Sequence, residues 1–195
     1  AGKYGKLSHA TIWEETNNIC LQLFTERRDT ILPLMAEEIR RFEGDSCRAF
    51  SVLNEWRRHL YRTGAVRSAD GAWELNTDSK KAWADVVTAL RPVVRERFRA
   101  CGPKDDLRAE RLAYALRDLQ DAQAVGLLLG EEPARNVVRY CSPLNDLQRK
   151  RPADPALVKL LASTNTQVRR CAAVALTESG DPALLGPLRK LLRDA

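Results

Sequence analysis

The fold is decided near the end of the chain by the stretch Val168-Arg169-Arg170-Cys171-Ala172-Ala173-Val174-Ala175-Leu176, which is followed by Gly180-Asp181-Pro182. The apolar residues of this stretch return at intervals of three and four, which is the period of one helix face. Gly180 suits the left-handed position just past a helix C-terminus. Asp181 and Pro182 suit the N-cap and the first turn of the next helix. The stretch therefore predicts a helix, a tight turn and a second, leucine-rich helix.

Similar hairpin signals occur twice upstream. Asp121, Asp154 and Asp181 mark the expected turn in three copies, at spacings of 33 and 27 residues, and such spacings are typical of helical repeats. A single hairpin of this kind cannot bury its apolar face alone, so the recurrence predicts a stack of helix pairs, an α-solenoid. The middle copy lacks alanines over 137–143 and is polar and basic over 145–153. We expect that hairpin to be distorted or looped.

The repeated pattern resembles the HEAT repeats, particularly the short variety found in phycobilisome lyase-type proteins. The resemblance is carried by Val168-Arg169, Ala172-Ala173, Ala175-Leu176 and Gly180-Asp181-Pro182, and it covers residues 104–195. It implies about three helical hairpins and says little about activity. The chain ends within a leucine-rich helix that lacks the polar outer face of a terminal repeat. We therefore expect the natural protein to continue beyond residue 195.

Residues 8–100 differ in kind from the repeats. Apolar stripes predict helices over 12–24, 31–42 and 47–62. The period then changes to that of two short strands, Ala65–Arg67 and Ala72–Leu75, joined by a turn that contains Asp-Gly. A long helix is expected to follow. The overall prediction is a mainly α fold: a helical domain over 8–100 with a β-hairpin at about 65–75, then a HEAT-like α-solenoid over 104–195.

Three helices followed by a hairpin is the order of a winged helix, and residues 53–75 resemble the third helix and wing of that family. In DNA-binding members this helix enters the major groove. The resemblance implies that arginines meet phosphates and that Asn54 or Arg58 reaches base edges. The same arginines also fit a solvated helix face near carboxylates, and many winged helices only pack against neighbouring domains. The residues of this nucleic-acid alternative are Arg48, Asn54, Arg57, Arg58, Arg62, Arg67 and Trp73.

Composition narrows the class of protein. The formal net charge is +6, from 32 Lys and Arg against 26 Asp and Glu, a weaker bias than that of dedicated nucleic-acid binders. Five scattered cysteines indicate free thiols in a reducing compartment. No apolar run approaches the ~20 residues of a membrane span, and no signal-peptide core is present at the start. We expect a cytoplasmic or nuclear protein without a membrane partner.

Catalytic signals are scarce. The two histidines, His9 and His59, are isolated, and the chain has no His-Glu pair, Cys-x-x-Cys, P-loop or dinucleotide fingerprint. The pairs Asp105-Asp106 and Glu131-Glu132 lie at expected helix starts, where carboxylates complement the helix dipole. We therefore expect no enzyme, no cofactor, no metal and no small-molecule substrate. An enzyme built on the repeats would require a deep pocket with convergent polar groups.

The function that the sequence favours is a non-catalytic protein–protein interaction module or scaffold within a larger protein or complex. Its expected partner is a protein with an acidic segment, because basic side chains recur on the first helix of each hairpin and in the loop of the middle copy. The alternative is a nucleic-acid-binding, winged-helix-like regulatory protein with a HEAT-repeat extension. The candidate partner-binding residues are Arg108, Arg111, Arg149, Lys150, Arg151, Arg169 and Arg170.

Overall fold

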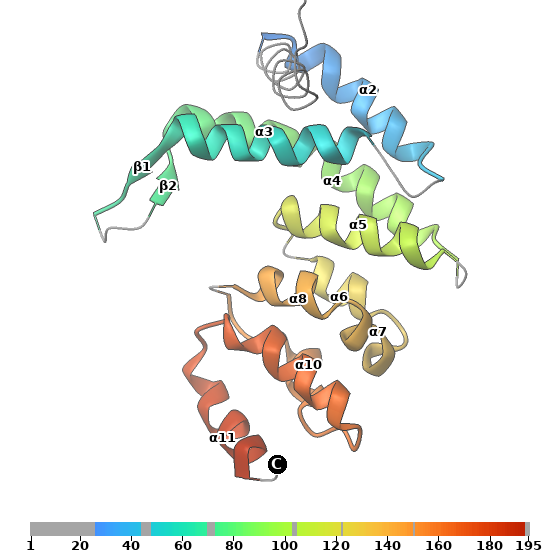
Figure 1. Cartoon of the computed structure of the whole chain (residues 1–195), viewed down its shortest axis with the longest axis vertical. Coiled ribbons are helices and arrows are strands. Elements are labelled where there is room, and N and C mark those ends of the chain that lie inside the picture. The colour runs from blue at the N-terminus through green and yellow to red at the C-terminus, as the bar shows by residue number, and fades with distance from the viewer. Residues whose placement is uncertain are drawn as a thin grey trace, which may run out of the picture. The chain divides into compact units, whose positions relative to one another are not determined.

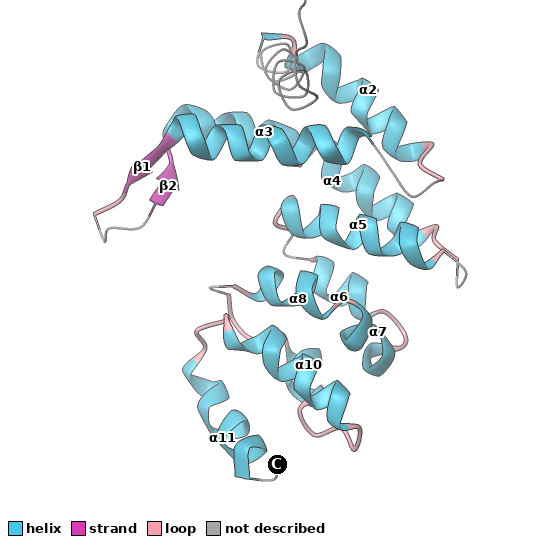
Figure 2. Ribbon diagram, in the orientation of Figure 1, coloured by secondary structure: helices cyan, strands magenta, loops and turns pink. Residues whose placement is uncertain are grey.

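The computed structural model describes residues 26–43, 48–69, 73–102, 105–121, 123–149 and 151–193, without the side chains of 48 and 190–193. This part of the chain is mainly helical and contains one two-stranded antiparallel sheet (Figures 1 and 2). The helix expected over 12–24 lies outside it. The chain divides into two compact units, residues 1–93 and 94–195. The division falls within one long helix, a few residues before the expected end of the helical domain at residue 100.

The first unit is built on helices α2 (Arg28–Arg40), α3 (Arg48–Gly64) and the start of α4 (Thr77–Arg99). The expected inward stripe of α3 is confirmed, because Leu53, Trp56 and Leu60 are buried. The indole of Trp83 on α4 stacks on that of Trp56, with ring centroids 5.7 Å apart. Aromatic pairs of this kind add about 0.5–1.5 kcal/mol to the contribution of the buried area. These contacts form the core of the unit.

The expected hairpin consists of β1 (Ala65–Arg67) and β2 (Trp73–Leu75), which pair antiparallel with Arg67 opposite Trp73. It leaves α3 and enters α4 directly. The backbone N–H of Asn76 donates to the carbonyl of Gly64 at 2.7 Å, and the side chain of Asn76 accepts from the N–H of Ser79 at 2.8 Å, at the start of α4. The Ser79 side chain occupies the space where a Cβ on residue 64 would lie, which explains the glycine at this junction.

The described residues of the second unit contain the helices of the three predicted hairpins. The helices that open them are α5 (Asp106–Asp118), the broken helix formed by α7 (Pro133–Arg139) and α8 (Cys141–Gln148), and α10 (Thr166–Thr177). The second members are α6 (Ala124–Leu129), α9 (Pro155–Leu160) and α11 (Leu185–Arg193), with the 3₁₀ turn η1 (Pro182–Leu184) before α11. Helix α8 contacts both α5 and α10, and Figure 1 shows these three helices in succession. The apolar side chains on one face of α5 and its C-cap are buried: Ala109, Leu112, Ala113, Leu116 and Leu119.

The middle hairpin is distorted, which was one of the two expectations for it, but it is not a loop, because 141–148 is helical. The opening helix is instead broken at Tyr140, between α7 and α8. Pro143 explains the break, since it has no N–H and its ring would clash with the carbonyl of Arg139 in a continuous helix. Beginning α8 at Cys141 puts Pro143 in the first turn, where a proline is tolerated. At the break, the ring of Tyr140 packs in a T-shaped arrangement against the ring of Phe98, with ring centroids 5.8 Å apart.

The three marker aspartates all lie in turns, and two of them also reach the preceding element. Asp154 and Asp181 cap their helices as expected, accepting from the N–H of Ala156 at 2.8 Å and of Ala183 at 2.9 Å. The second oxygen of Asp181 accepts from the N–H of Ala153 in the previous turn, at 3.2 Å. The turns are therefore linked to one another as well as capped.

Asp121 has no exposed side-chain surface and binds the guanidinium of Arg95 through both carboxylate oxygens. The turn that contains Asp154 also contacts the turn at Asp121, because the side chain of Arg151 donates to the carbonyl of Gln120 at 3.0 Å. Gly180 adopts the expected left-handed conformation, with φ of +69°. It lies three residues past Thr177, the last residue of α10, rather than directly behind the helix cap.

Candidate interaction surface

Four of the seven predicted partner-binding residues are used inside the second unit. Arg108 pairs with Asp105, and its hydrogen bond lowers the pKa of that carboxyl. Arg169 donates to the carbonyls of Ser163 and Thr164 at 2.8 and 3.0 Å and so closes the loop before α10. These two arginines therefore stabilise local structure.

The other two engaged arginines link neighbouring hairpins. Arg149 lies 3.2 Å from a carboxylate oxygen of Asp146 and 3.6 Å from one of Glu178, across the contact of α8 with α10. Arg151 is the donor to the turn at Gln120 described above. Lys150, the third basic residue of this loop, lies outside the described residues.

The remaining two, Arg111 and Arg170, are exposed and form no hydrogen bond or ion pair with any described residue. Each lies four positions from an exposed apolar residue on its helix. On α5 this residue is Leu107, which is 60% exposed, and on α10 it is Val174, which is 42% exposed. Residues four apart share a helix face, so α5 and α10 each carry a solvent-facing pair of one cation and one apolar side chain. We call Leu107, Arg111, Arg170 and Val174 the outer stripes.

Helix α8 contacts both α5 and α10, the helices that carry the outer stripes. Asn145 on α8 donates to the carbonyl of Val174 at 2.5 Å, and Asp146 lies 3.6 Å from Arg117 on α5. Side chains of α8 thus fix the spacing of α5 and α10.

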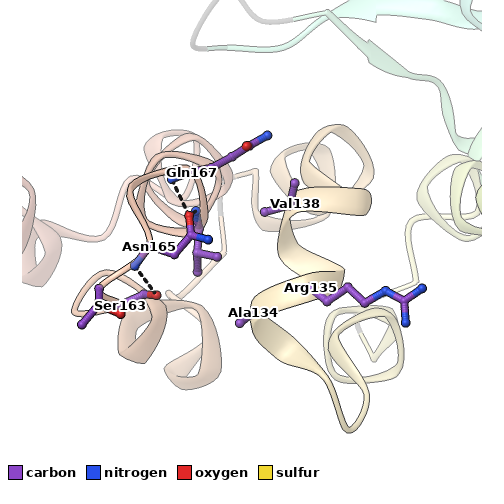
Figure 3. A pocket seen from close by; sticks show the side chains of 8 residues that line it. Ala134, Arg135, Val138, Ser163, Asn165 and Gln167 are labelled. Carbon is purple, nitrogen blue, oxygen red and sulfur yellow. Dashed lines mark hydrogen bonds between the residues drawn. The ribbon is translucent and has the colours of Figure 1, made fainter.

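A separate pocket of about 520 Å³ lies between α7 and the start of α10. Its lining is small and neutral apart from one arginine: Ala134, Arg135, Val138, Ser163, Thr164, Asn165, Gln167 and Val168. Asn165 is the N-cap of α10, and its side chain accepts from the N–H of Gln167 at 2.9 Å (Figure 3). The side chain of Arg135 extends away from α10 toward the carboxylate of Glu132, 3.1 Å away. The lining brings no acid and base together, so this pocket lacks the groups that general acid–base catalysis needs.

The nucleic-acid candidates divide between the outward face of α3 and the hairpin. Asn54, Arg58 and Arg62 follow one another at four-residue spacing opposite the buried stripe of α3. Arg58 is held by Glu55 at 2.8 Å, and Arg57 is half-buried, whereas Arg62 is exposed. The side chain of Arg48 lies outside the described part.

On the hairpin, the guanidinium of Arg67 lies 5.6 Å from the ring centroid of Trp73, whose side chain is 64% exposed. The side chain of Trp73 is therefore accessible to a partner. By contrast, Trp56 is buried and Trp83 stacks on it, so both belong to the core of the first unit.

Two thiols that the sequence did not pair lie together between α8 and α10. The sulfur of Cys141 is 3.8 Å from the carbonyl oxygen of Cys171. Burial, together with a hydrogen bond between the two thiols, raises the pKa of Cys141 to about 11. Within the residues that the structure describes, no cluster of three or more His, Cys, Asp or Glu side chains is arranged to hold a metal ion. Nor is any helix there long and apolar enough to cross a membrane.

Comparison of the chain with protein-family models, with curated proteins and with solved structures finds no match. The function must therefore be inferred from the residues themselves.

Proposed function

We propose that this chain is a non-catalytic scaffold whose residues 104–195 form a HEAT-like α-solenoid and bind an acidic protein segment through the outer stripes. The observation that carries the proposal is the pairing of exposed Leu107 with Arg111 and of exposed Val174 with Arg170. Three helix pairs with linked turns are the expected form of such a stack. The turn contacts of Asp121 and Asp181 support this reading.

The chemistry of the outer stripes favours a partner with both carboxylates and apolar side chains. Exposed apolar residues beside uncompensated cations are typical of interaction sites, where an apolar centre contributes affinity and charge complementarity contributes specificity. Arginine suits this role because its planar guanidinium binds carboxylates through two hydrogen bonds. The four engaged arginines already have acceptors within the unit, so a partner would gain less from them.

Charge reversal at the outer stripes tests the proposal. The probes are fluorescent peptides in which Glu and Asp alternate with Leu and Phe, and Lys-substituted peptides of the same length. The wild-type chain should bind the acidic set, and Arg111→Glu combined with Arg170→Glu should weaken binding by at least about tenfold. Lys159→Glu combined with Arg189→Glu is the matched control, because it changes the net charge equally on exposed positions of α9 and α11. Equal losses in the two double variants would mean that only net charge matters and would reject the outer stripes.

Nucleic-acid binding is the second candidate, and the stacked pair of Arg67 and Trp73 favours it. An exposed indole beside a guanidinium suits stacking on a base and contact with a phosphate. Random-sequence duplex and single-stranded DNA should then bind with an affinity that falls steeply with salt. Arg62→Glu combined with Arg67→Glu should remove this binding without affecting the acidic peptides, so the two candidates are separable. No binding at low salt would remove this candidate.

A further inference from the structure

Cys141 and Cys171 are brought together only by the fold. Cys141 is the first residue of α8, and Cys171 lies in the middle of α10, thirty positions later. The two helices are packed against each other, and both thiols are free. The sulfur of Cys141 lies 3.8 Å from the backbone carbonyl oxygen of Cys171, and the two thiols share a hydrogen bond, so the two cysteines are in direct contact across the packed helices.

Both side chains are only half-buried, so a small oxidant can reach them. Neither thiol occupies a position in the outer stripes or in the pocket between α7 and α10. Their proximity therefore serves neither the proposed scaffold function nor the pocket lining. Two neighbouring thiols with solvent access have one chemistry that isolated buried thiols lack, which is reversible bond formation with each other.

We propose that Cys141 and Cys171 form a reversible redox site, at which a small-molecule disulfide such as oxidised glutathione converts the two thiols into an intramolecular disulfide between α8 and α10. In the first step, one protein thiolate attacks a sulfur of the small disulfide, and the small S–S bond breaks with release of one small thiolate. In the second step, the other protein thiolate attacks the mixed disulfide, and the second small thiolate leaves. The protein loses two electrons and two protons, and the small disulfide gains them as two thiols.

The consequence of the bond follows from its place in the stack. It joins the opening helix of the middle hairpin to that of the last hairpin, so it fixes the distance between them. Arg170 of the outer stripes precedes Cys171 directly. Oxidation would therefore hold one cation of that face in a fixed position relative to α8. This last effect depends on the proposed function, whereas formation of the bond does not.

The test counts thiols in the full chain after Cys20, Cys47 and Cys101 have been changed to Ser, with circular dichroism as the check that the helices are retained. Incubation with oxidised glutathione should lower the titre from two thiols per chain to none. Mass spectrometry should show the loss of two hydrogen atoms without bound glutathione, and dithiothreitol should restore both thiols. In the same background, Cys141→Ser and Cys171→Ser should each accumulate a glutathione adduct instead.

Three outcomes would overturn the proposal. The first is an adduct on each cysteine without an internal bond, and the second is a bond between two chains. The third is the survival of both thiols under conditions in which the urea-unfolded chain forms the bond, because the folded geometry would then oppose it. None of these outcomes depends on peptide binding, so failure here is distinguishable from failure of the scaffold proposal.

Discussion

Replacing Asp121 with Asn should destabilise the protein far more than a comparable change on the surface. Asp121 has no exposed side-chain surface, whereas the side chain of its partner Arg95 keeps 22% of its exposure. Breaking a buried ion pair on one side costs roughly 3–5 kcal/mol. Because Arg95 retains some water, we take the lower end, about 3 kcal/mol, which is on the order of a hundredfold in the unfolding equilibrium. Asn keeps an oxygen that can accept from the N–H of Gln123, so the substitution isolates the ion pair.

The matched control is Glu132→Gln, which breaks the pair with Arg135, whose side chains are 62% and 59% exposed. Exposed pairs contribute about 0–1 kcal/mol, so this variant should unfold close to the wild type. The assay is urea unfolding followed by helical circular dichroism, with Arg95→Met and the double variant completing a cycle. The double variant should lose less stability than the sum of the two single variants. Each single variant leaves one charged group without its partner, whereas the double variant removes both charges. If D121N loses no more stability than E132Q, the buried pair does not hold the first turn and our reasoning is wrong.

Three further predictions concern packing and titration. Gly64→Ala should lower the free energy of unfolding in urea by about 1–3 kcal/mol, since its Cβ would overlap the Ser79 side chain. Adding Ser79→Ala should recover part of this loss. An unchanged urea midpoint in G64A would contradict the prediction. Trp56→Ala should cost at least about 3 kcal/mol and Trp73→Ala less than about 0.5 kcal/mol, because only the first is buried; similar losses would place Trp73 in a core. The thiol of Cys141, with a pKa of about 11, should be alkylated at pH 8 roughly a hundredfold more slowly than a thiol of pKa 9. The alkylation rate should rise through pH 11 as the thiolate forms. If Cys141 is labelled as fast in the folded chain as in the unfolded chain, its pKa is not raised.

Local features of this fold could be predicted from the sequence because short-range physics sets them. The stripe of α3 and that of α5 follow the helical period, and their members are buried. The Asp-Pro pairs at 154 and 181 cap helices because the carboxylate and the proline act on their own turn. The hairpin has its expected pairing because the two short strands lie close together in the sequence.

The remainder depends on contacts between residues far apart in the chain. The sequence gives no sign that Arg149 and Arg151 are held by Glu178 and by the carbonyl of Gln120, whereas Arg111 and Arg170 have no such partner among the residues that the structure describes. Glu178 and Gln120 lie far from these arginines in the sequence, so only packing brings each guanidinium to its acceptor. The contact between Cys141 and Cys171 could not be predicted either, because it joins two residues that lie thirty positions apart in the chain. Pro143 accounts for the break at Tyr140, but a proline alone would not have located it, since α2 and α4 continue through Pro33 and Pro92.

The break at Tyr140 has a mechanical consequence for the second unit. In a continuous helix the carbonyl of Arg139 would accept from the N–H of residue 143, but proline supplies no donor, so the two sides share no hydrogen bond at that point. α7 and α8 are therefore separate helices, and we expect their junction to bend more readily than the continuous helices α5 and α10. The aromatic contact of Tyr140 with Phe98 ties this joint to the last turns of α4. We therefore expect bending of this part of the second unit to occur at Tyr140 and to move Phe98 with it.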